Sequence, residues 1–279
     1  MLTLLQFIHA REDVRKRREA GMPWPWTDNP ILQRYKFCNV RREDDRVTRE
    51  IARMMRRPHE RDRDLWFALL VARRACNWPP TLAELGYPVP WKPERFLTVI
   101  RRRIAAGEKA FEAQAYKLIC SKQHGEQADL LVRLVLTPAW QNREYFRPQP
   151  DDTLRSYHAR LSEAAFVGSF HAAQVVADLK YTRGLENAAD WWDFAASGPG
   201  SRRGLNRVLG RDVNAYWKED LWFASLTKLR RELKVSNLHA QDLQNCLCEY
   251  DKFCRIQMGQ GNVRPYAPPE ERELLEVTV

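Results

Sequence analysis

Residues 160–209 read RLSEAAFVGSFHAAQVVADLKYTRGLENAADWWDFAASGPGSRRGLNRVL. A helix-compatible run in this stretch meets a short turn at 167–169, and a second run follows with apolar residues at positions i, i+3, i+4 and i+7 of 172–179. Two short helices around a glycine turn predict a helix-hairpin-helix, whose turn offers backbone N–H groups to a phosphate. We therefore expect Gly168 and Ser169 to contact DNA.

The second half of this stretch combines acidic and aromatic side chains at 190–194 with a tight glycine loop at 197–204 that carries two arginines. A carboxylate between aromatic rings and a glycine loop beside arginines suggest chemistry on a nucleotide. The loop is no Walker motif, because no GK[ST] ends it, although a phosphate can still approach Gly200. The alternative interpretation is an ordinary helical core with two ordinary loops.

The charge of the chain favours a polyanionic partner. Its 279 residues include 46 Lys and Arg against 36 Asp and Glu, which gives a net charge of +10. Such an excess is typical of proteins that bind nucleic acid. No apolar run reaches the roughly 18 residues that would span a membrane, so we expect no membrane partner. The six cysteines form no disulfide framework, which favours a reducing cytoplasm.

Helical periods dominate the rest of the sequence. No hairpin-spaced pairs of strands occur, so the fold is expected to be mainly α. Further helices are expected over 64–77, 109–121, 215–234 and 240–257. A Pro- and Gly-rich terminal loop and tail follow the last of them.

A dense block of charge lies near the N-terminus, where residues 37–49 read FCNVRREDDRVTR. Arg42 and Arg46 are four residues apart, so on a helix they would share a face and could grip a phosphate together. A structural salt-bridge ladder with Glu43 and Asp45 is the comparable alternative.

The best metal-ligand candidates in the sequence are His239, Cys246, Cys248 and Cys254. Their spacing fits neither a zinc site nor a common iron–sulfur pattern. Buried structural cysteines, and no metal site, are therefore expected.

Four blocks of the sequence together resemble the α-glutamyl/putrescinyl thymine pyrophosphorylase family of bacterial viruses: FCNVRREDDRVTR, the hairpin VGSFHAAQVVADLKYT, the loop GPGSRRGLNR and the helix LCEYDK. The blocks run in family order, so the resemblance covers most of the chain. It implies a mainly α, two-lobed fold like that of helix-hairpin-helix DNA glycosylases. The implied parts are an N-terminal helical lobe at 1–150, a hairpin lobe at 151–259 and a tail at 260–279, with the active-site cleft between the lobes.

The resemblance also implies a phage transferase that acts in thymine hypermodification. In that chemistry a kinase first pyrophosphorylates 5-hydroxymethyluracil in DNA, and the transferase then displaces pyrophosphate with an amine such as glycine, glutamate or a polyamine. The implied partners are double-stranded DNA with a modified thymine and the amine or amino acid, in the cytoplasm of the infected bacterial host. No cofactor is readable from the sequence, although the chemistry is compatible with a divalent cation on the pyrophosphate.

The implied reaction gives expected roles to four groups of residues. The amine must lose a proton to a carboxylate, and Asp193 among its tryptophans is the first choice as general base. The target nucleobase would flip out of the duplex and stack on aromatic rings. The candidates are Asp193, Asp178 and Glu249 for catalysis; Asn39, Arg42, Asp45, Arg46, Arg202 and Lys252 for pyrophosphate; Gly168, Ser169, Lys180, Gly198, Gly200 and Arg203 for DNA; and Trp191, Trp192 and Tyr181 for base stacking.

The chain departs from the expected patterns at three positions. Phe166 stands at the first glycine of the hairpin motif, Phe170 at the position of a Schiff-base lysine, and Arg41 where an aromatic residue is expected. Two other functions stay open. One is a helix-hairpin-helix DNA glycosylase that hydrolyses the N-glycosidic bond with Asp193, and the other is a non-catalytic DNA-binding module.

Overall fold

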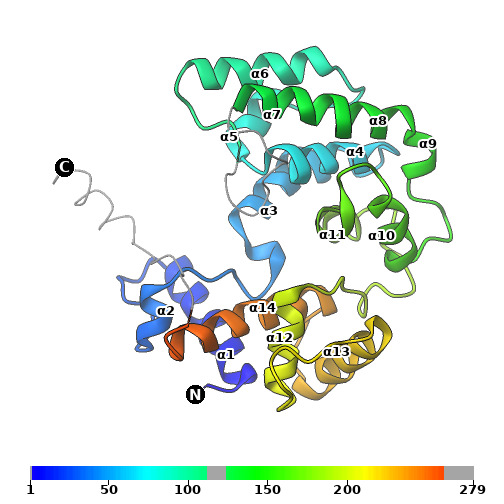
Figure 1. Ribbon diagram of the computed structural model, residues 1–279. Coiled ribbons are helices and arrows are strands. Elements are labelled where there is room, and N and C mark those ends of the chain that lie inside the picture. Colours follow the sequence, from blue (N-terminus) through cyan, green and yellow to red (C-terminus); the bar gives the residue numbers. More distant parts are fainter. Residues whose placement is uncertain (1, 112–123, 261–279) are drawn as a thin grey trace. The chain divides into compact units, whose positions relative to one another are not determined.

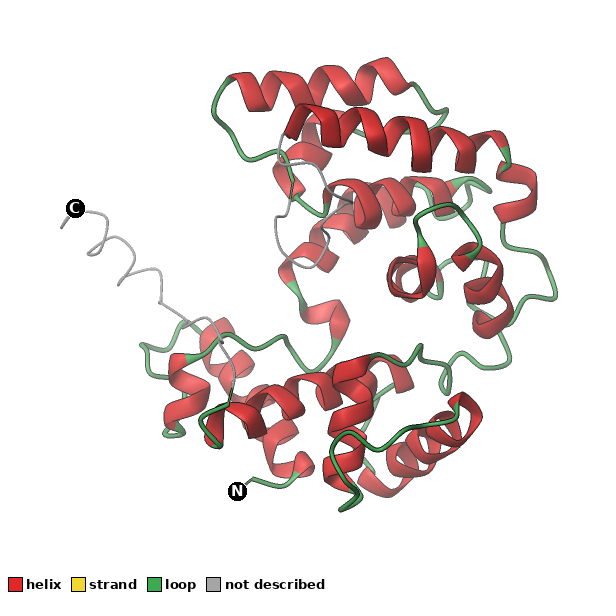
Figure 2. Ribbon diagram, viewed as in Figure 1, coloured by secondary structure: helices red, strands yellow, loops and turns green. Residues whose placement is uncertain are grey.

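The computed structural model describes residues 2–111 and 124–260, and within these ranges the regular secondary structure is helical, without a β-strand (Figures 1 and 2). The prediction of a mainly α fold is therefore confirmed. The helix predicted over 109–121 and the tail predicted over 260–279 lie largely outside the described residues. Among the described helices, none combines the length and apolar character that crossing a membrane requires.

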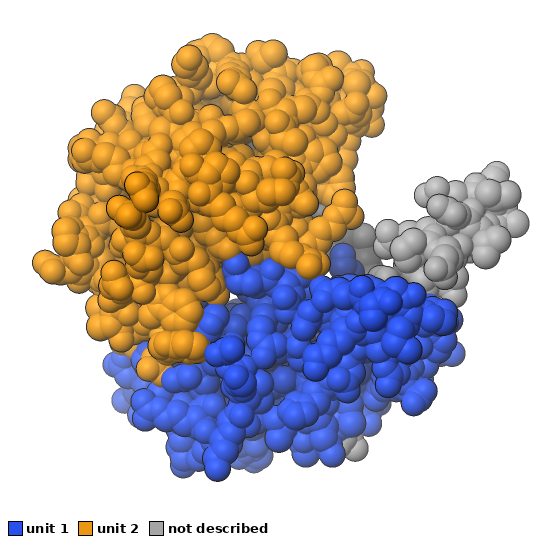
Figure 3. All heavy atoms as spheres, turned by 180° about the vertical axis from the view of Figure 1, so that it is seen from behind, with its two compact units in different colours: residues 1–45, 197–279 blue, residues 46–196 orange. Residues whose placement is uncertain are grey.

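The chain divides into two compact units, which Figure 3 colours separately. Unit 1 consists of residues 1–45 and 197–279, and unit 2 of residues 46–196. The predicted lobes, 1–150 and 151–259, follow the order of the chain, whereas unit 1 combines its two ends.

Unit 1 is organised around one long helix near the C-terminus. Helix α14 contacts α1, α2, α12 and α13. Phe7 lies at the centre of this packing, with ring centroids 5.8 Å from Tyr250 and 5.4 Å from Phe253. The elements of this unit are α1 (Leu4–Glu19), α2 (Pro30–Arg34), the short 3-10 turn η1 (Arg42–Asp44), α12 (Pro199–Val208), α13 (Glu219–Leu233) and α14 (Ala240–Gln257).

Two glycines bring α12 unusually close to α14. A Cβ atom on Gly204 would lie 2.1 Å from the carbonyl oxygen of Leu247, and one on Gly200 would lie 3.1 Å from Sγ of Cys248. Real Cβ atoms do not approach backbone atoms as closely as the first of these distances. The glycine spacing of GSRRG therefore serves helix-to-helix packing.

The segment predicted as a glycine loop at 197–204 is largely helical. Pro199 occupies the first position of α12, where its missing N–H costs nothing. The N–H of Gly198 donates to the hydroxyl of Ser201 at 3.0 Å, which closes the helix start. Gly198 thus caps the helix and Gly200 lies inside it.

The charged block at 37–49 is not one helix, which corrects the prediction that Arg42 and Arg46 share a helical face. The turn η1 ends at Asp44, and Asp45 has extended backbone angles, with φ −72° and ψ 133°. Arg46 then begins α3, the first helix of unit 2. The extended residue breaks the helical register between the two arginines.

Unit 2 is built around an entirely buried helix. All six residues of α4 are buried, and α4 contacts α11. The elements of this unit are α3 (Arg46–Ile51), α4 (Leu65–Leu70), α5 (Pro79–Leu85), α6 (Pro93–Ala105), α7 (His124–Leu131), α8 (Thr137–Gln141), α9 (Arg143–Phe146), α10 (Leu154–Ser162) and α11 (Gly168–Leu179), with π-helical turns η2 (Ala52–Arg56), η3 (Val71–Cys76) and η4 (Val132–Leu136).

Helices α10 and α11 pack against each other and are joined by the turn that the sequence predicts. Two residues of this turn have left-handed backbone angles, Phe166 with φ 59° and Gly168 with φ 60°. Glycine adopts this conformation freely, whereas a phenylalanine does so at a cost of about 1–2 kcal/mol. Contacts around the turn must therefore hold Phe166 in place.

Replacing Gly204 with alanine is expected to destabilise unit 1, because no side-chain rotation relieves the overlap of its Cβ with the Leu247 backbone. The free energy of unfolding should fall by about 1–3 kcal/mol or more. Gly198→Ala is the matched control, since its Cβ would meet only Nε2 of Gln244 at 3.9 Å. Thermal denaturation of both variants measures the difference, and equal melting temperatures would show that the close approach is not required.

Candidate functional site

Three arginine side chains converge on one carboxylate where α12 packs against α14. The carboxylate of Asp251 is fully buried and accepts hydrogen bonds from Nε of Arg203 at 2.9 Å and Nε of Arg207 at 2.8 Å. Nε of Arg255 lies 3.3 Å from the same carboxylate. We call Arg203, Arg207 and Arg255 the arginine cluster. One carboxylate against three guanidinium groups leaves two positive charges in excess.

Helical spacing explains how the arginine cluster forms. Arg203 and Arg207 are one turn apart on α12, and Asp251 and Arg255 are one turn apart on α14. The glycine-mediated approach of the two helices then brings all four side chains together. Of these residues, only Arg203 was singled out by the sequence as a contact to DNA.

Glu249 and Lys252 of α14 hold the chain segment that follows α2. The carboxylate of Glu249 accepts a hydrogen bond from the backbone N–H of Cys38 at 3.2 Å and one from Lys252 at 2.7 Å. The ammonium of Lys252 lies 4.7 Å from the ring centroid of Phe37. Arg11, which is buried, donates to the carbonyl oxygen of Phe37 at 3.0 Å. Glu249 and Lys252 therefore have clear structural partners, and their predicted roles with substrate stay predictions.

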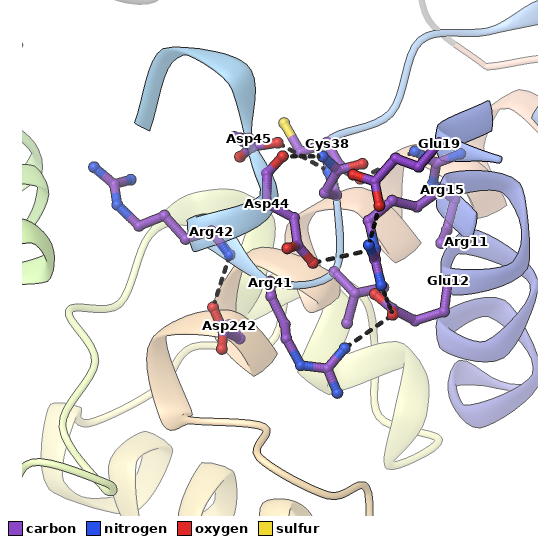
Figure 4. Close-up of polar contacts among 12 residues, drawn as sticks. Arg11, Glu12, Arg15, Glu19, Cys38, Arg41, Arg42, Asp44, Asp45 and Asp242 are labelled. Carbon is purple, nitrogen blue, oxygen red and sulfur yellow. Dashed lines mark hydrogen bonds and ion pairs between the residues drawn. The ribbon is translucent and has the colours of Figure 1, made fainter. Parts of the chain in front are cut away.

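The segment around Asn39 is held by hydrogen bonds to its own turn and to α14 (Figure 4). The backbone N–H of Asn39 donates to the carboxylate of Asp45 at 3.2 Å, and its side-chain amide donates to the carbonyl of Asp44 at 2.9 Å. The backbone N–H of Arg42 donates to Asp242 at 3.0 Å. The guanidinium of Arg42 points away from this network in Figure 4.

Ion pairs connect the same segment to α1. Arg15 lies 3.1 Å from the carboxylate of Asp44, and Arg41 lies 2.9 Å from that of Glu12. The block at 41–45 thus takes part in a salt-bridge network. Its partners Glu12 and Arg15 lie on α1, so the sequence of residues 37–49 alone does not reveal them.

Arg202 differs from its neighbour Arg203. Its guanidinium donates to Glu219 at 2.6 Å and to the hydroxyl of Ser197 at 2.8 Å. Glu219 therefore compensates the charge of Arg202. The predicted contact of Arg202 with pyrophosphate stays a prediction.

In unit 2, Asp178 forms a buried ion pair. Its two oxygens accept from Nε and Nη2 of Arg73 at 2.6 and 2.8 Å, and Arg73 also donates to the hydroxyl of Thr48 at 3.0 Å. The side chains of Arg73 and Asp178 are 3% and 1% exposed. A carboxylate held in this way is well placed to stabilise the unit and poorly placed to reach a substrate.

Lys180, predicted to contact DNA, is fully buried. Its ammonium donates to the carbonyl of Trp191 at 2.8 Å and lies 3.8 Å from the centre of that ring. The indole N–H of Trp191 donates back to the carbonyl of Lys180 at 2.6 Å. The two residues therefore fasten the end of α11 to the aromatic cluster, and burial keeps this ammonium from the surface.

The other residues of the 190–194 cluster have different surroundings. Tyr181 packs edge-on against Trp191 with centroids 5.5 Å apart, whereas Trp192 is 43% exposed. Asp190 caps α10, because its carboxylate accepts from the backbone N–H groups of Leu154 and Arg155. Asp193 lies in a turn and is half-buried, so its role as a base stays a prediction.

Arg74 of η3 is buried, has no acidic partner among the described residues and contacts the turn between α10 and α11. Nε of Arg74 donates to the carbonyl of Phe166 at 2.8 Å, which holds this residue in its left-handed conformation. The side chain of Arg74 is buried, and its Nη1 has no hydrogen-bond partner among the described residues. Burial lowers the pKa of the Arg74 guanidinium to about 10, so it stays charged at neutral pH.

His171 lies in the first turn of α11 and contacts the turn that precedes it. Its Nδ1 lies 3.0 Å from the carbonyl of Val167, and because a carbonyl only accepts, Nδ1 carries the proton. Burial first, and the charge of Arg74 next, lower the pKa of His171 to about 4. Gly168 and Ser169 are exposed beside it. An exposed pair of residues at a helix start, above a buried positive charge, is suited to an anion.

Unit 2 also contains a cavity of about 500 Å³, lined by residues from 60–66, 144–149 and 179–184. None of the predicted site residues lines it. In the described part of the chain, no three His, Cys, Asp or Glu side chains are grouped so that they could hold a metal ion. A divalent cation carried by substrate phosphates stays a prediction from the chemistry.

Sequence reasoning placed Arg207 near a phosphate at Gly200 but missed Arg74, Asp251 and Arg255 as parts of these sites. A signal for Arg74 was present, because two adjacent arginines interrupt the apolar run at 64–77. A buried helix rarely carries charge without a specific partner or ligand.

Comparison with known proteins identifies relatives of the chain. The family described as "5-hmdU DNA kinase, helical domain" matches residues 1–262. A 5-hmdU DNA kinase of Bacillus phage SP10 is 25% identical over 261 residues, which cover 85% of this chain and 40% of that protein. The chain thus spans about two-fifths of the length of this relative. No solved structure matches significantly.

These relatives correct the predicted reaction. The matched family is that of a helical domain of 5-hmdU DNA kinases, and the phage relative is such a kinase, so the relatives belong to thymine modification as the resemblance implied. These kinase relatives contradict the prediction of a transferase that displaces pyrophosphate with an amine, and they give no support to a glycosylase. The amine co-substrate has no support either. The resemblance therefore agrees with the relatives in thymine modification and differs from them in the reaction.

Asp178→Asn is expected to lower the free energy of unfolding by about 3–5 kcal/mol, because it leaves the buried Arg73 without its counter-charge. The control is Asp129→Asn, which breaks an exposed pair with Arg101 and should cost only about 0–1 kcal/mol. Denaturant unfolding monitored by circular dichroism measures both. An Asp178→Asn protein as stable as the control would disprove the structural role.

The low pKa of His171 predicts a pH-dependent stability. As the pH falls from 6.5, the ordinary histidine pKa, towards 4, the unfolded chain binds a proton that the folded chain does not. The stability contributed by neutral His171 is therefore present above pH 6.5 and lost as the pH approaches 4. His171→Gln should make the decline in unfolding free energy shallower over this range, whereas replacing the exposed His9 should not. Parallel curves for the wild type and His171→Gln would contradict the prediction.

Proposed function

The chain belongs to the family of the helical domain of 5-hmdU DNA kinases, and from this membership we propose that it takes part in the phosphorylation of 5-hydroxymethyldeoxyuridine in phage DNA. Its part is to bind the DNA and to present the modified base. In this proposal its partner is the phage DNA in the infected bacterial cell.

The chemistry of the kinase separates two tasks. The hydroxymethyl oxygen attacks the terminal phosphorus of a nucleoside triphosphate, an O–P bond forms, the hydroxyl proton leaves and a nucleoside diphosphate departs. One task is to hold the donor phosphates, for which many kinases use a glycine-rich loop that ends in GK[ST], and the 279 residues contain no such loop. The other task is to hold the DNA, and the α10–α11 turn of unit 2 suits it.

The observation that carries the proposal is the buried Arg74 below the α10–α11 turn. A charge taken out of water without a counter-ion costs several kcal/mol, so a nearby anion is expected to stabilise it. The exposed Gly168 and Ser169 at the start of α11 give a DNA phosphate a place to lie. In this proposal α10, the turn and α11 form a helix-hairpin-helix of the kind found in DNA glycosylases, used for binding without base excision.

The net charge of +10 supports the same proposal. Positive charge raises the rate at which a protein meets DNA and supplies affinity that does not depend on sequence. Each phosphate that the protein neutralises should contribute about 0.9 to the slope of log K against log salt concentration.

Arg74→Gln is expected to weaken binding to a duplex containing 5-hydroxymethyldeoxyuridine about tenfold, since the attraction of the buried positive charge for a phosphate at the start of α11 is lost. The slope of affinity against salt should fall by about 0.9. The substitution removes both an uncompensated buried charge and the hydrogen bond to the carbonyl of Phe166, so the folding of the variant is verified alongside its affinity. Fluorescence anisotropy with a labelled duplex, together with thermal denaturation, measures these effects.

Arg101→Gln is the matched control, because it removes the same charge from an exposed position of unit 2. Equal losses of affinity in the two variants, or binding that is indifferent to salt, would contradict the hairpin as the DNA-binding element. Duplexes that differ only in a hydroxymethyl or a methyl group at C5 test the second part of the proposal. Equal affinities for the two would contradict a role in presenting the modified base.

A further inference from the structure

The arginine cluster of unit 1 has a different charge pattern from the hairpin of unit 2. Asp251, the acidic residue that Arg203, Arg207 and Arg255 share, is fully buried. The three arginine side chains are 33%, 18% and 34% exposed. The anchoring carboxylate is thus hidden from solvent while part of each cation is accessible.

The contacts to Asp251 leave the outer edges of the guanidinium groups available. Both hydrogen bonds, and the closest approach of Arg255, use the Nε atom. The terminal Nη atoms of Arg203 and Arg207 have no hydrogen-bond acceptor among the described residues. Guanidinium groups fixed at Nε are pre-organised, so less side-chain entropy is lost when their Nη atoms bind phosphate oxygens.

The neighbouring Arg202, also on α12, carries no such excess of positive charge. Glu219 and Ser197 engage its guanidinium. The excess of two charges is therefore specific to the face of α12 that meets α14.

We propose that the arginine cluster binds the polyphosphate chain of a nucleotide. Three guanidinium groups that converge on one carboxylate concentrate their charge within one small area. A triphosphate concentrates three to four negative charges in a similarly small space, whereas the phosphates along a DNA strand carry one charge each and are spaced apart. The convergence of the cluster therefore matches a polyphosphate better than a DNA backbone.

The choice of nucleotide rests on the proposed function. A DNA kinase consumes a nucleoside triphosphate, and arginine side chains neutralise charge on its phosphates during transfer. The cluster would hold such a donor without a glycine-rich loop. Its recognition of the phosphate groups requires no contact with the nucleobase.

The test uses the full chain and two probes, inorganic triphosphate and ATP, in isothermal titration calorimetry. Both probes should bind the wild type, and Arg203→Gln and Arg207→Gln should each weaken binding about tenfold or more, as expected for the loss of a charge-assisted hydrogen bond. Arg202→Gln removes the same charge one residue away and should change the affinity less than about twofold, because Glu219 already engages this side chain. Circular dichroism verifies that each variant is folded, and Arg255→Gln provides a third variant on the other helix.

Three results would overturn the inference. The first is that neither probe binds the folded wild type. The second is that Arg202→Gln and Arg203→Gln have equal effects on the affinity. The third is that the cluster variants lose affinity for DNA although triphosphate does not bind. The last result would identify DNA as the occupant. Arg74→Gln separates this inference from the proposed function: if the hairpin alone fails, triphosphate binding still depends on the cluster, and if the cluster alone fails, DNA binding still depends on Arg74.

Discussion

The close contact of α12 with α14 is the constraint on which unit 1 depends. A side chain at Gly204 would overlap the backbone of Leu247, so the two helices meet at a distance that only glycine permits. This contact places two arginines of α12 on Asp251 of α14. Because α14 also contacts α1, α2 and α13, one glycine-dependent approach connects the packing of the unit to the arginine cluster.

The sequence predicted what depends on local pattern and failed where distant residues decide. The helices at 240–257 and on both sides of the hairpin turn follow from the spacing of apolar residues, and the structure contains them. The segment GPGSRRG was predicted as a loop because glycine and proline often break helices. The same letters also describe a helix start with proline at its first position and two packing glycines, and only the partner helix distinguishes these readings.

The candidate site was harder to predict than the fold for the same reason. Asp178 and Lys180 lie in a stretch suited to chemistry, but their burial depends on Arg73, more than a hundred residues away, and on Trp191. The resemblance predicted an enzyme of thymine modification, in agreement with the relatives, but it predicted amine transfer where the relatives are kinases. Two of its blocks, GPGSRRGLNR and LCEYDK, pack against each other in α12 and α14, and helix packing does not distinguish one reaction from another.

Two adjacent arginines of η3 are both buried but differ in their partners. Arg73 has a buried carboxylate on Asp178 with two short hydrogen bonds, so its charge is neutralised within the fold. Arg74 is equally buried, donates only to the carbonyl of Phe166 and keeps a low pKa. A fold that needed both residues only for stability would gain from a partner for the second or from an apolar residue in its place. An anion at the exposed start of α11, as proposed above for a DNA phosphate, would supply the counter-charge that Arg74 lacks among the described residues.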